Sequence, residues 1–251
     1  MVLEETGLTG KLYGIGVGPG APDLLTLRGW RIITGTPVIA YPAPDTGPSF
    51  ARSIVDGCIR QDHIEIPIVV PMRVERFPAA DVYDKACSEI ATHLDEGRDV
   101  AVLCEGDPFF YGSFMYVYQR LAGNYDCEIV PGVSSIMMGA AVSGIPLAAR
   151  NDVLTIIPGP LPDDEMRNRI GAADALVIMK VGRHLQRIRA LLSELGLLDK
   201  AAYLERVSLN EQRTMRLADM TDDAAPYFSM ITIYKGAEPW IKTANMNVTG
   251  Q

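Results

Sequence analysis

Short apolar runs alternate with helical patterns through the first 142 residues, and this alternation restricts the possible folds more than any other feature. Runs typical of strands cover Lys11–Val17, Val38–Tyr41, Ile64–Val70, Asp99–Cys104 and Cys127–Val130, and Pro67 interrupts the third run. Helical patterns cover Asp23–Thr34, Ser49 to about Cys58, Asp81–Glu96, Gly112–Leu121 and Ser134–Val142. Such alternation predicts parallel strands joined by crossover helices, with helices on both faces of the sheet.

Three of these helices carry end signals. Asp23 is expected near the N-cap of the first helix, with Gly35 at its end, and Ser49 is expected to cap the second. Gly97 occupies the position after the Asp81–Glu96 helix where glycine commonly ends a helix.

The second half of the chain has a different pattern. Strands are predicted at Val153–Ile157, Ala175–Met179, Ala202–Leu204, Arg213–Leu217 and Tyr227–Tyr234, and a helix at Arg183–Leu195 that ends before Gly196. The last two strands are expected to pair as antiparallel neighbours. We therefore predict an α/β protein of two α/β domains, with a mostly parallel sheet in residues 1–131, a mixed sheet in 132–245 and a polar tail in 246–251.

Composition narrows the class of protein. The chain has 251 residues, of which 48% are hydrophobic and 22% charged, as in globular proteins. Its net charge of −8 disfavours nucleic acid or an anionic membrane as the main partner, because both favour a basic face. The N-terminal MVLEETGLTG lacks the features of a signal peptide, and no run of about 20 apolar residues occurs, so we expect a cytoplasmic protein.

Cysteine and histidine spacing predicts neither disulfides nor a metal site. Cys58, Cys87, Cys104 and Cys127 lie in apolar segments and form no CxxC pair, so we expect reduced thiols in the core. His63, His93 and His184 are widely spaced, and no pair has the spacing of zinc ligands.

A glycine-rich loop, Gly14-Ile-Gly16-Val-Gly18-Pro19-Gly20, ends the first predicted strand. The dinucleotide fingerprint GxGxxG would need glycine at position 19, and Pro19 removes an amide that would face a pyrophosphate. This disfavours a nicotinamide oxidoreductase. Two interpretations remain: a loop whose backbone closely approaches a ligand, with Pro19 as a rigid wall, or a tight strand-to-helix turn.

Two further loops follow predicted strands. Glu105-Gly-Asp-Pro-Phe-Phe-Tyr-Gly112 is either an Asp-Pro turn or an extended segment whose backbone, with Phe110, can contact a ligand. In Val130-Pro-Gly-Val-Ser-Ser135, either serine can cap the next helix. In open α/β sheets ligands bind beyond the carboxyl ends of the strands, so three such loops predict a ligand site at one edge.

The order of these motifs resembles the tetrapyrrole methylase family. The resemblance extends from about Lys11 to Lys235 and includes Leu24-Leu-Thr-Leu-Arg-Gly29 after the first loop and Gly144-Ile-Pro-Leu147 after the third. It implies two domains with the ligand cleft between them, S-adenosylmethionine as methyl donor, no metal, and a homodimer. The family's contacts to the donor map onto Pro19, Glu105, Gly106, Asp107, Phe110, Ser134 and Ser135, with looser matches at Lys180 and Val207.

Within the family, four segments are most similar to members that methylate carbon C20 of precorrin-2. They lie around Pro37–Pro42, Asp99–Phe114, Ile178–Gly182 and Leu204–Ser208. The resemblance thus implies conversion of precorrin-2 into precorrin-3A in cobalamin biosynthesis. Alternatives are methylation of cobalt-precorrin-2, methylation of another corrin precursor, or a non-catalytic sensor of S-adenosylmethionine. The residues do not select a base among Asp107, Glu105 and Tyr111.

A tetrapyrrole rich in carboxylates requires cations, and arginine pairs with carboxylates in a bidentate manner. Candidates in or near the loops are Arg28, Arg52, Arg73, Arg76, Arg150, Lys180, Arg183 and His184. The segment Pro71–Pro78 is bounded by prolines and is a candidate lid. The alternative for each cation is a solvated surface charge.

Overall fold

The computed structural model describes residues 9–70 and 78–236, and the contacts divide the chain into two units between Ser134 and Ser135. The predicted domain boundary, between residues 131 and 132, lies slightly earlier in the chain. The predicted tail at 246–251 and most of the candidate lid, with Arg73 and Arg76, lie outside the described residues.

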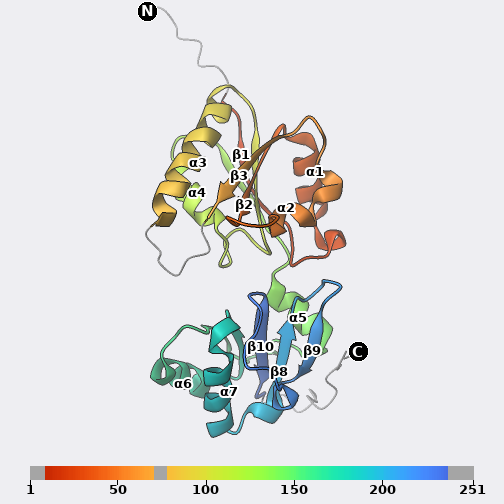
Figure 1. The fold of residues 1–251 in the computed structure, drawn as a ribbon, viewed down its shortest axis with the longest axis vertical. Helices are drawn as coiled ribbons and strands as arrows, with labels where there is room; N and C mark the ends of the chain where they lie inside the picture. Colours follow the sequence, from red (N-terminus) through yellow and green to blue (C-terminus); the bar gives the residue numbers. More distant parts are fainter. Residues whose placement is uncertain (1–8, 71–77, 237–251) are drawn as a thin grey trace, which may run out of the picture. The chain divides into compact units, whose positions relative to one another are not determined.

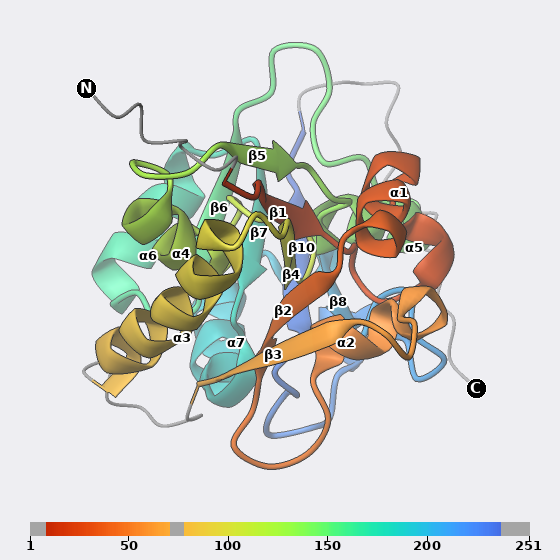
Figure 2. The same ribbon diagram turned by 90° about the horizontal axis from the view of Figure 1, so that it is seen from above.

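The N-terminal unit is built on a five-stranded sheet in the order β3-β2-β4-β1-β5, with every pair parallel (Figures 1 and 2). The strands are β1 (Leu12–Gly16), β2 (Val38–Ala43), β3 (Ile64–Val69), β4 (Val100–Cys104) and β5 (Cys127–Val130). Helices α1 (Leu27–Gly35) and α2 (Phe50–Ile54) cover one face, and α3 (Pro78–Asp95) and α4 (Phe114–Leu121) cover the other.

Strand β4 explains why the sheet is covered on both faces. All five of its residues are buried, and side chains alternate between the faces of a strand. Val100, Val102 and Cys104 join the core under α3 and α4, whereas Ala101 and Leu103 join the core under α1 and α2. A strand that is apolar on both faces requires helices on both, as the sequence predicted.

The first helix begins later than predicted. Pro22–Leu24 forms a separate 3-10 turn, and α1 begins at Leu27 with Thr26 as N-cap. The Gly29 N–H donates to Thr26 Oγ1 at 3.1 Å, and Leu25 between the two helices is extended. The prediction that Asp23 lies near the N-cap of a helix over Asp23–Thr34 is therefore wrong.

The predicted cap at Ser49 is confirmed, because its Oγ accepts the Arg52 N–H at 3.2 Å. The helix it caps is short, and a 3-10 turn at Asp56–Cys58 completes the predicted segment. Pro67 does not interrupt β3. Among the strands that the structure describes, β3 pairs with β2 alone, so it lies at the sheet edge, a position where a residue without an N–H is tolerated.

The C-terminal unit contains a mixed sheet in the order β6-β7-β10-β8-β9. Its strands are β6 (Leu154–Pro158), β7 (Ala175–Met179), β8 (Ala201–Glu205), β9 (Arg213–Arg216) and β10 (Ser229–Tyr234). Strands β6 and β7 are parallel, and the other neighbouring pairs are antiparallel. Helices α6 (Asp163–Ala172) and α7 (Leu185–Glu194) pack on one face, and α5 (Ser135–Ser143) packs on β8 and β10 from the other.

The strand pairing and one helix of this unit differ from the prediction. Strands β9 and β10 were expected to be neighbours. Instead, each of them pairs with β8, which lies between them. Helix α6 was not predicted, because only Met166 and Ile170 of its ten residues are buried and its first turn is acidic. Within residues 9–70 and 78–236, no helix is long and apolar enough to cross a membrane.

Candidate functional site

The three predicted loops meet at the carboxyl edge of the N-terminal sheet. Strands β4, β1 and β5 are adjacent and parallel, so their carboxyl ends lie side by side. Beyond these ends, the Gly18 N–H donates to the Gly106 carbonyl at 3.3 Å and the Gly106 N–H donates to the Gly18 carbonyl at 2.8 Å. The prediction that the loops share one edge is therefore confirmed.

Glycines allow the three backbones to approach closely. A Cβ on Gly16 would lie 2.5 Å from the Gly132 nitrogen and 2.6 Å from the Gly106 oxygen. A Cβ on Gly132 would lie 2.0 Å from the same Gly106 oxygen. Neither position has space for a side chain, and Gly106 has a φ of +64°, which favours glycine.

Asp107 joins two of the loops with its carboxylate. Oδ1 accepts the Phe109 and Phe110 N–H groups at 2.9 and 3.1 Å, and Oδ2 accepts the Gly132 N–H at 3.1 Å. Hydrogen bonds from three backbone amides to one carboxylate hold the loop in shape. The Asp-Pro segment is therefore a turn, and it is also tied to the neighbouring loop.

Glu105, the residue after β4, lies on the side of the sheet covered by α2. Burial raises the pKa of its carboxyl, and hydrogen bonds from its own backbone and from that of Ala51 partly oppose this shift. A partly buried carboxylate is destabilised in its charged form, so Glu105 binds a proton more readily than an ordinary glutamate.

The aromatic residues of the second loop lie at its outer part. The rings of Phe110 and Tyr111 meet edge to face, with centroids 5.1 Å apart. Tyr111 has a left-handed φ of +57° and is 44% exposed, whereas Pro19 is buried. An exposed tyrosine with a strained backbone, in a loop between a strand and a helix, is typical of functional loops.

Ser134 and Ser135 lie on either side of the division between the units. A Cβ on Gly106 would lie 3.8 Å from the Ser134 Cα, so Ser134 adjoins the three loops. Ser135 begins α5 in the C-terminal unit. The predicted donor-binding residues of the first unit thus come together from three loops, with Ser135 at the start of the second unit.

Lys180 and Val207 lie at one edge of the C-terminal sheet. Strands β7 and β8 are both antiparallel to β10, so they run in the same direction, and Lys180 and Val207 follow their carboxyl ends. Lys180 has a φ of +57°, and Arg206 and Ser208, on either side of the buried Val207, have φ values of +47° and +70°. Left-handed residues other than glycine are costly, and their clustering marks this edge as a second candidate site.

A turn at Ala225–Ser229 lies between these two loops, and the sequence analysis missed it by assigning Tyr227 and Phe228 to a strand. The Ala225 N–H donates to the Gly182 carbonyl at 3.3 Å, and the Arg206 N–H donates to the Phe228 carbonyl at 2.8 Å. Strand β10 begins only at Ser229. Pro226 before two aromatic residues was the available sequence signal for a turn.

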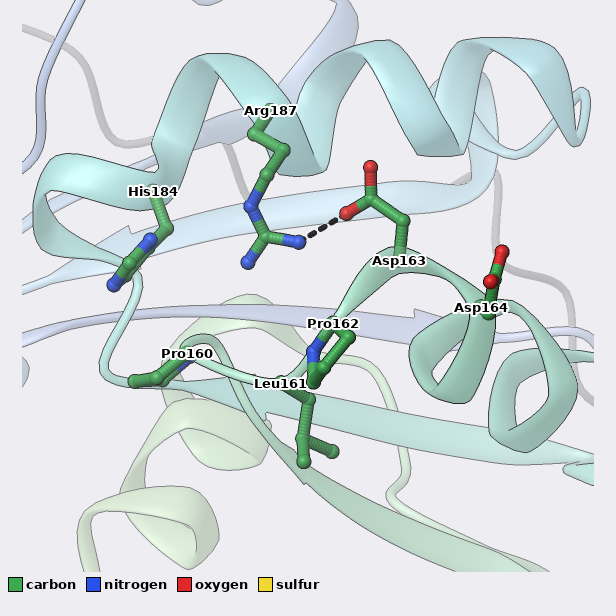
Figure 3. Close-up of a pocket in the computed structure, with 7 residues that line it drawn as sticks. All are labelled: Pro160, Leu161, Pro162, Asp163, Asp164, His184 and Arg187. Carbon is green, nitrogen blue, oxygen red and sulfur yellow. Dashed lines mark hydrogen bonds and ion pairs between the residues drawn. The ribbon is translucent and has the colours of Figure 1, made fainter.

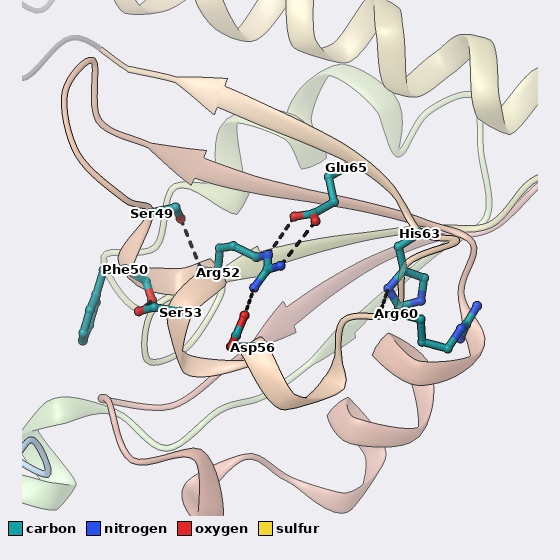
Figure 4. A network of polar contacts seen from close by, with 8 residues as sticks. All are labelled: Ser49, Phe50, Arg52, Ser53, Asp56, Arg60, His63 and Glu65. Carbon is teal, nitrogen blue, oxygen red and sulfur yellow. Dashed lines mark hydrogen bonds and ion pairs between the residues drawn. The ribbon is translucent and has the colours of Figure 1, made fainter.

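Two of the candidate cations form ion pairs within the N-terminal unit. Arg52 donates to both oxygens of Glu65, at 2.7 and 3.3 Å, and to Asp56 at 2.6 Å (Figure 4). Arg28 donates from Nε to Glu128 at 2.8 Å. Any substrate carboxylate would have to compete with these ion pairs. The pair between Arg52 and Glu65 holds α2 against β3.

His184 lines a shallow pocket of about 420 Å³ at the carboxyl end of β6, together with Pro160, Leu161, Pro162, Asp163, Asp164 and Arg187 (Figure 3). Arg187 bridges Asp163 and the Gly159 carbonyl. Burial and the charges of Arg187 and Arg183 lower the pKa of His184, so the imidazole is mainly neutral at pH 7. None of the predicted donor contacts lines this pocket.

Within residues 9–70 and 78–236, no group of three or more His, Cys, Asp or Glu side chains is arranged to hold a metal ion. The four cysteines form no disulfide. Cys87 and Cys104 are buried as predicted, whereas Cys58 and Cys127 are only partly buried.

Parallel strands that end in glycine-rich loops define a class of α/β protein that binds a small molecule through backbone groups beyond the strand ends. The N-terminal unit has this construction. The chain belongs to the tetrapyrrole (corrin/porphyrin) methylase family, whose model matches residues 11–220.

Three curated relatives are similar over most of the chain. "Cobalamin biosynthesis protein CobIJ" of Mycobacterium tuberculosis is 39% identical over 96% of the chain, which spans about half (49%) of that protein. "Precorrin-2 C(20)-methyltransferase" of Sinorhizobium sp. is 38% identical, covering 89% of the chain and 95% of that protein. "Cobalt-precorrin-2 C(20)-methyltransferase" of Salmonella typhimurium is 32% identical, covering 91% and 98%.

Solved structures confirm the fold class. The structure of the methyltransferase CobJ matches with a TM-score of 0.68 at 20% identity, covering 94% of this chain and 98% of that one. Uroporphyrin-III C-methyltransferase from Thermus thermophilus, complexed with S-adenyl homocysteine, matches with a TM-score of 0.65 at 21% identity, covering 90% and 98%.

Proposed function

We propose that the chain transfers a methyl group from S-adenosylmethionine to C20 of precorrin-2, giving precorrin-3A, in cobalamin biosynthesis. The observation that carries this proposal is the 38% identity to the Sinorhizobium enzyme over 95% of that protein's length. The glycine-rich loops at the carboxyl edge of the N-terminal sheet agree with it.

The arrangement of the loops is suitable for the donor. Gly16, Gly106 and Gly132 bring three backbones together without side chains, which leaves peptide groups as the main polar surface at the strand ends. We propose that Pro19, Glu105, Gly106, Asp107, Phe110, Ser134 and Ser135 hold the donor in this unit. Lys180 and Val207 are the proposed contacts from the C-terminal unit. When bound, S-adenosylmethionine supplies a methyl group that its sulfonium has already activated.

The protein then has to align the two reactants, and this supplies most of the rate. Loops tied together by the Gly18–Gly106 bonds and by Asp107 provide a rigid frame for that alignment. Because both Asp107 oxygens accept backbone N–H groups, Asp107 serves as a positioning residue. Glu105 and Tyr111 remain the candidates to accept a proton from C20, and the raised pKa of Glu105 suits that role.

Methylation of the cobalt-loaded substrate is the second candidate, and the 32% identity to the Salmonella enzyme favours it. The test is to incubate the purified protein anaerobically with S-adenosylmethionine and either precorrin-2 or cobalt-precorrin-2. Mass spectrometry and carbon NMR then locate the added methyl group. We expect one methyl at C20 in the metal-free reaction.

Each other outcome contradicts part of the proposal. Turnover with the cobalt form alone would keep the reaction and change the substrate. Donor binding without methyl transfer to either substrate would favour a sensor of S-adenosylmethionine. We also propose a homodimer, by analogy with the family, and sedimentation equilibrium at the protomer mass would contradict it.

A further inference from the structure

Helices α3 and α4 bring two tyrosines together beside the candidate site of the N-terminal unit. The helices pack side by side, and each connects two parallel strands, so both begin at the carboxyl edge of the sheet (Figure 1). Tyr116 lies in the first turn of α4, which follows the loop Glu105–Gly112, and Tyr83 lies in the second turn of α3. The two rings therefore adjoin the second glycine-rich loop.

The two rings differ in exposure. Tyr116 is 45% exposed, whereas Tyr83 is buried. The ring centroids are 5.0 Å apart, and the ring planes are inclined at 42°. The Tyr116 ring thus packs on a buried ring with one side and leaves its other side open. An aromatic ring that is supported from below and open above is arranged for stacking on a further ring.

Polar contacts hold this pair in place. Arg120 donates from Nη1 to the Tyr116 carbonyl at 3.0 Å and from Nε to Asp84 at 2.6 Å. Its guanidinium also lies 5.9 Å from the centroid of the Tyr83 ring, within the range of a cation–π contact. The Ser113 side chain, just before α4, hydrogen-bonds the Tyr83 hydroxyl. A rigid support of this kind reduces the ordering that a ligand has to impose when it binds.

The tyrosine pair lies next to the proposed donor contacts without being one of them. None of the residues proposed to hold the donor belongs to α3 or α4. The pair is nevertheless close to the site, because the charge of Glu105 adds to burial in raising the pKa of Tyr83. A tetrapyrrole has to lie beside the donor, with C20 near the activated methyl group, so it needs a surface next to the donor loops.

We infer that Tyr116 is a substrate-binding residue whose open ring face stacks on a pyrrole ring of the tetrapyrrole. This inference rests on the proposed function, because it takes the tetrapyrrole as substrate. Stacking requires the aromatic face and not the phenol hydroxyl. Phenylalanine can therefore replace Tyr116, whereas an aliphatic side chain cannot.

The test compares Tyr116→Leu with Tyr116→Phe. We expect Tyr116→Leu to raise the Kd and the KM for precorrin-2 roughly three- to tenfold, and Tyr116→Phe to change them less than about twofold. The kcat should stay within about twofold in both variants, as for a contact made equally in the ground state and the transition state. The calorimetric Kd for S-adenosylhomocysteine should not change, because the ring contacts the substrate and not the donor.

Tyr125→Leu is the matched control, since it makes the same exchange at the opposite edge of the same sheet. Tyr125 precedes β5, and its hydroxyl donates to Asp95 at 2.8 Å, near the end of α3. The affinity of this variant for precorrin-2 should equal that of the wild-type protein. All variants are compared at a temperature at which circular dichroism shows them folded.

Three results would overturn the inference. The first is wild-type affinity for precorrin-2 in Tyr116→Leu. The second is a weaker Kd for S-adenosylhomocysteine with unchanged affinity for precorrin-2, which would assign the ring to the donor. The third is an equal loss of affinity in Tyr116→Leu and Tyr125→Leu, which would show a general effect of removing a tyrosine.

Binding of precorrin-2 is measured anaerobically by difference absorbance, so it does not depend on turnover. If the wild-type protein binds precorrin-2 without methylating it, the proposed function fails, and weaker binding by Tyr116→Leu still supports the stacking contact. If the wild-type protein methylates precorrin-2 and Tyr116→Leu binds it normally, the proposed function stands and the inference fails. If the wild-type protein does not bind precorrin-2, both proposals fail.

Discussion

At the scale of single residues, the carboxylate of Asp107 has the most defined structural role in the candidate site. It accepts three backbone N–H groups from two loops. Asp107→Ala leaves these groups without their acceptor, and we expect a loss of about 2 kcal/mol in the free energy of unfolding. Urea denaturation measures this loss, and a weaker calorimetric Kd for S-adenosylhomocysteine should accompany it.

The control for this variant is Asp164→Ala, which removes an exposed carboxylate from the first turn of α6. It should change the free energy of unfolding by less than about 0.5 kcal/mol. Equal stability of the two variants would show that the Asp107 hydrogen bonds do not hold the loops.

Glu105 leads to a prediction about pH. Burial raises the pKa of this carboxyl, so the folded protein binds the proton more tightly than the unfolded chain does. The contribution of Glu105 to the free energy of unfolding is therefore largest below the unfolded pKa of about 4.3. This contribution is lost as pH rises through the folded pKa. We expect Glu105→Gln to raise the Tm at pH 7.5 and to change it little at pH 4.

Calorimetry at the two pH values checks this prediction, with the exposed Glu211→Gln as control. A lower Tm for Glu105→Gln at pH 7.5 would show that the ionised carboxylate is stabilised in the folded state. The donor-binding assay on the same variant tests separately whether Glu105 contacts the ligand.

At the scale of elements, the short helix α2 is positioned by an ion pair. Arg52 binds Glu65 of β3 through two nitrogens, and this hydrogen bonding is the main cause of the lowered pKa of Glu65 (Figure 4). A lowered folded pKa stabilises the protein above the unfolded pKa of about 4.3, and the effect is lost as pH falls through the folded value.

We expect Glu65→Gln to reduce the free energy of unfolding by about 1 kcal/mol at pH 7, a modest amount because the pair is partly solvated. The difference from the wild-type protein should shrink towards zero in strong acid, where Glu65 itself is protonated. Chemical denaturation at pH 7 and in acid measures both values. A difference that persists in acid would assign the effect to packing.

Some elements could be predicted from local sequence pattern, and others could not. The order of strands and helices in the N-terminal unit followed from the alternation of short apolar runs with helical patterns along the chain. Helix α6 has only two buried residues and therefore no apolar stripe to detect. The pairing of β9 with β8 depends on how distant segments meet, which no local window contains.

At the scale of the whole molecule, the thiols give a direct test of the redox state. Burial raises the pKa of Cys87, Cys104 and Cys127 to about 11, so little thiolate is present at neutral pH. We expect slow reaction with a thiol reagent in the native state and four equivalents in denaturant without reductant. Fewer than four would indicate a disulfide or an oxidised cysteine.

The sequence by itself determined the alternating architecture, the glycine-rich loops and the family. These features depend on short-range effects: side-chain periodicity, the conformational freedom of glycine and the order of motifs along the chain. Ser49 and Gly97 were assigned correctly for the same reason, since a cap acts within a few residues.

Only the tertiary structure decided which groups meet across the chain. Asp107 was a candidate base until its oxygens were found to bind Gly132 in another loop. Arg52 was a candidate for substrate carboxylates until it was found clamped by Glu65. Tyr227 and Phe228 looked like strand residues until their turn was found between the loops after β7 and β8. A hydrogen bond or ion pair between distant segments leaves no periodic pattern in the sequence. Only the tertiary structure shows which partners meet.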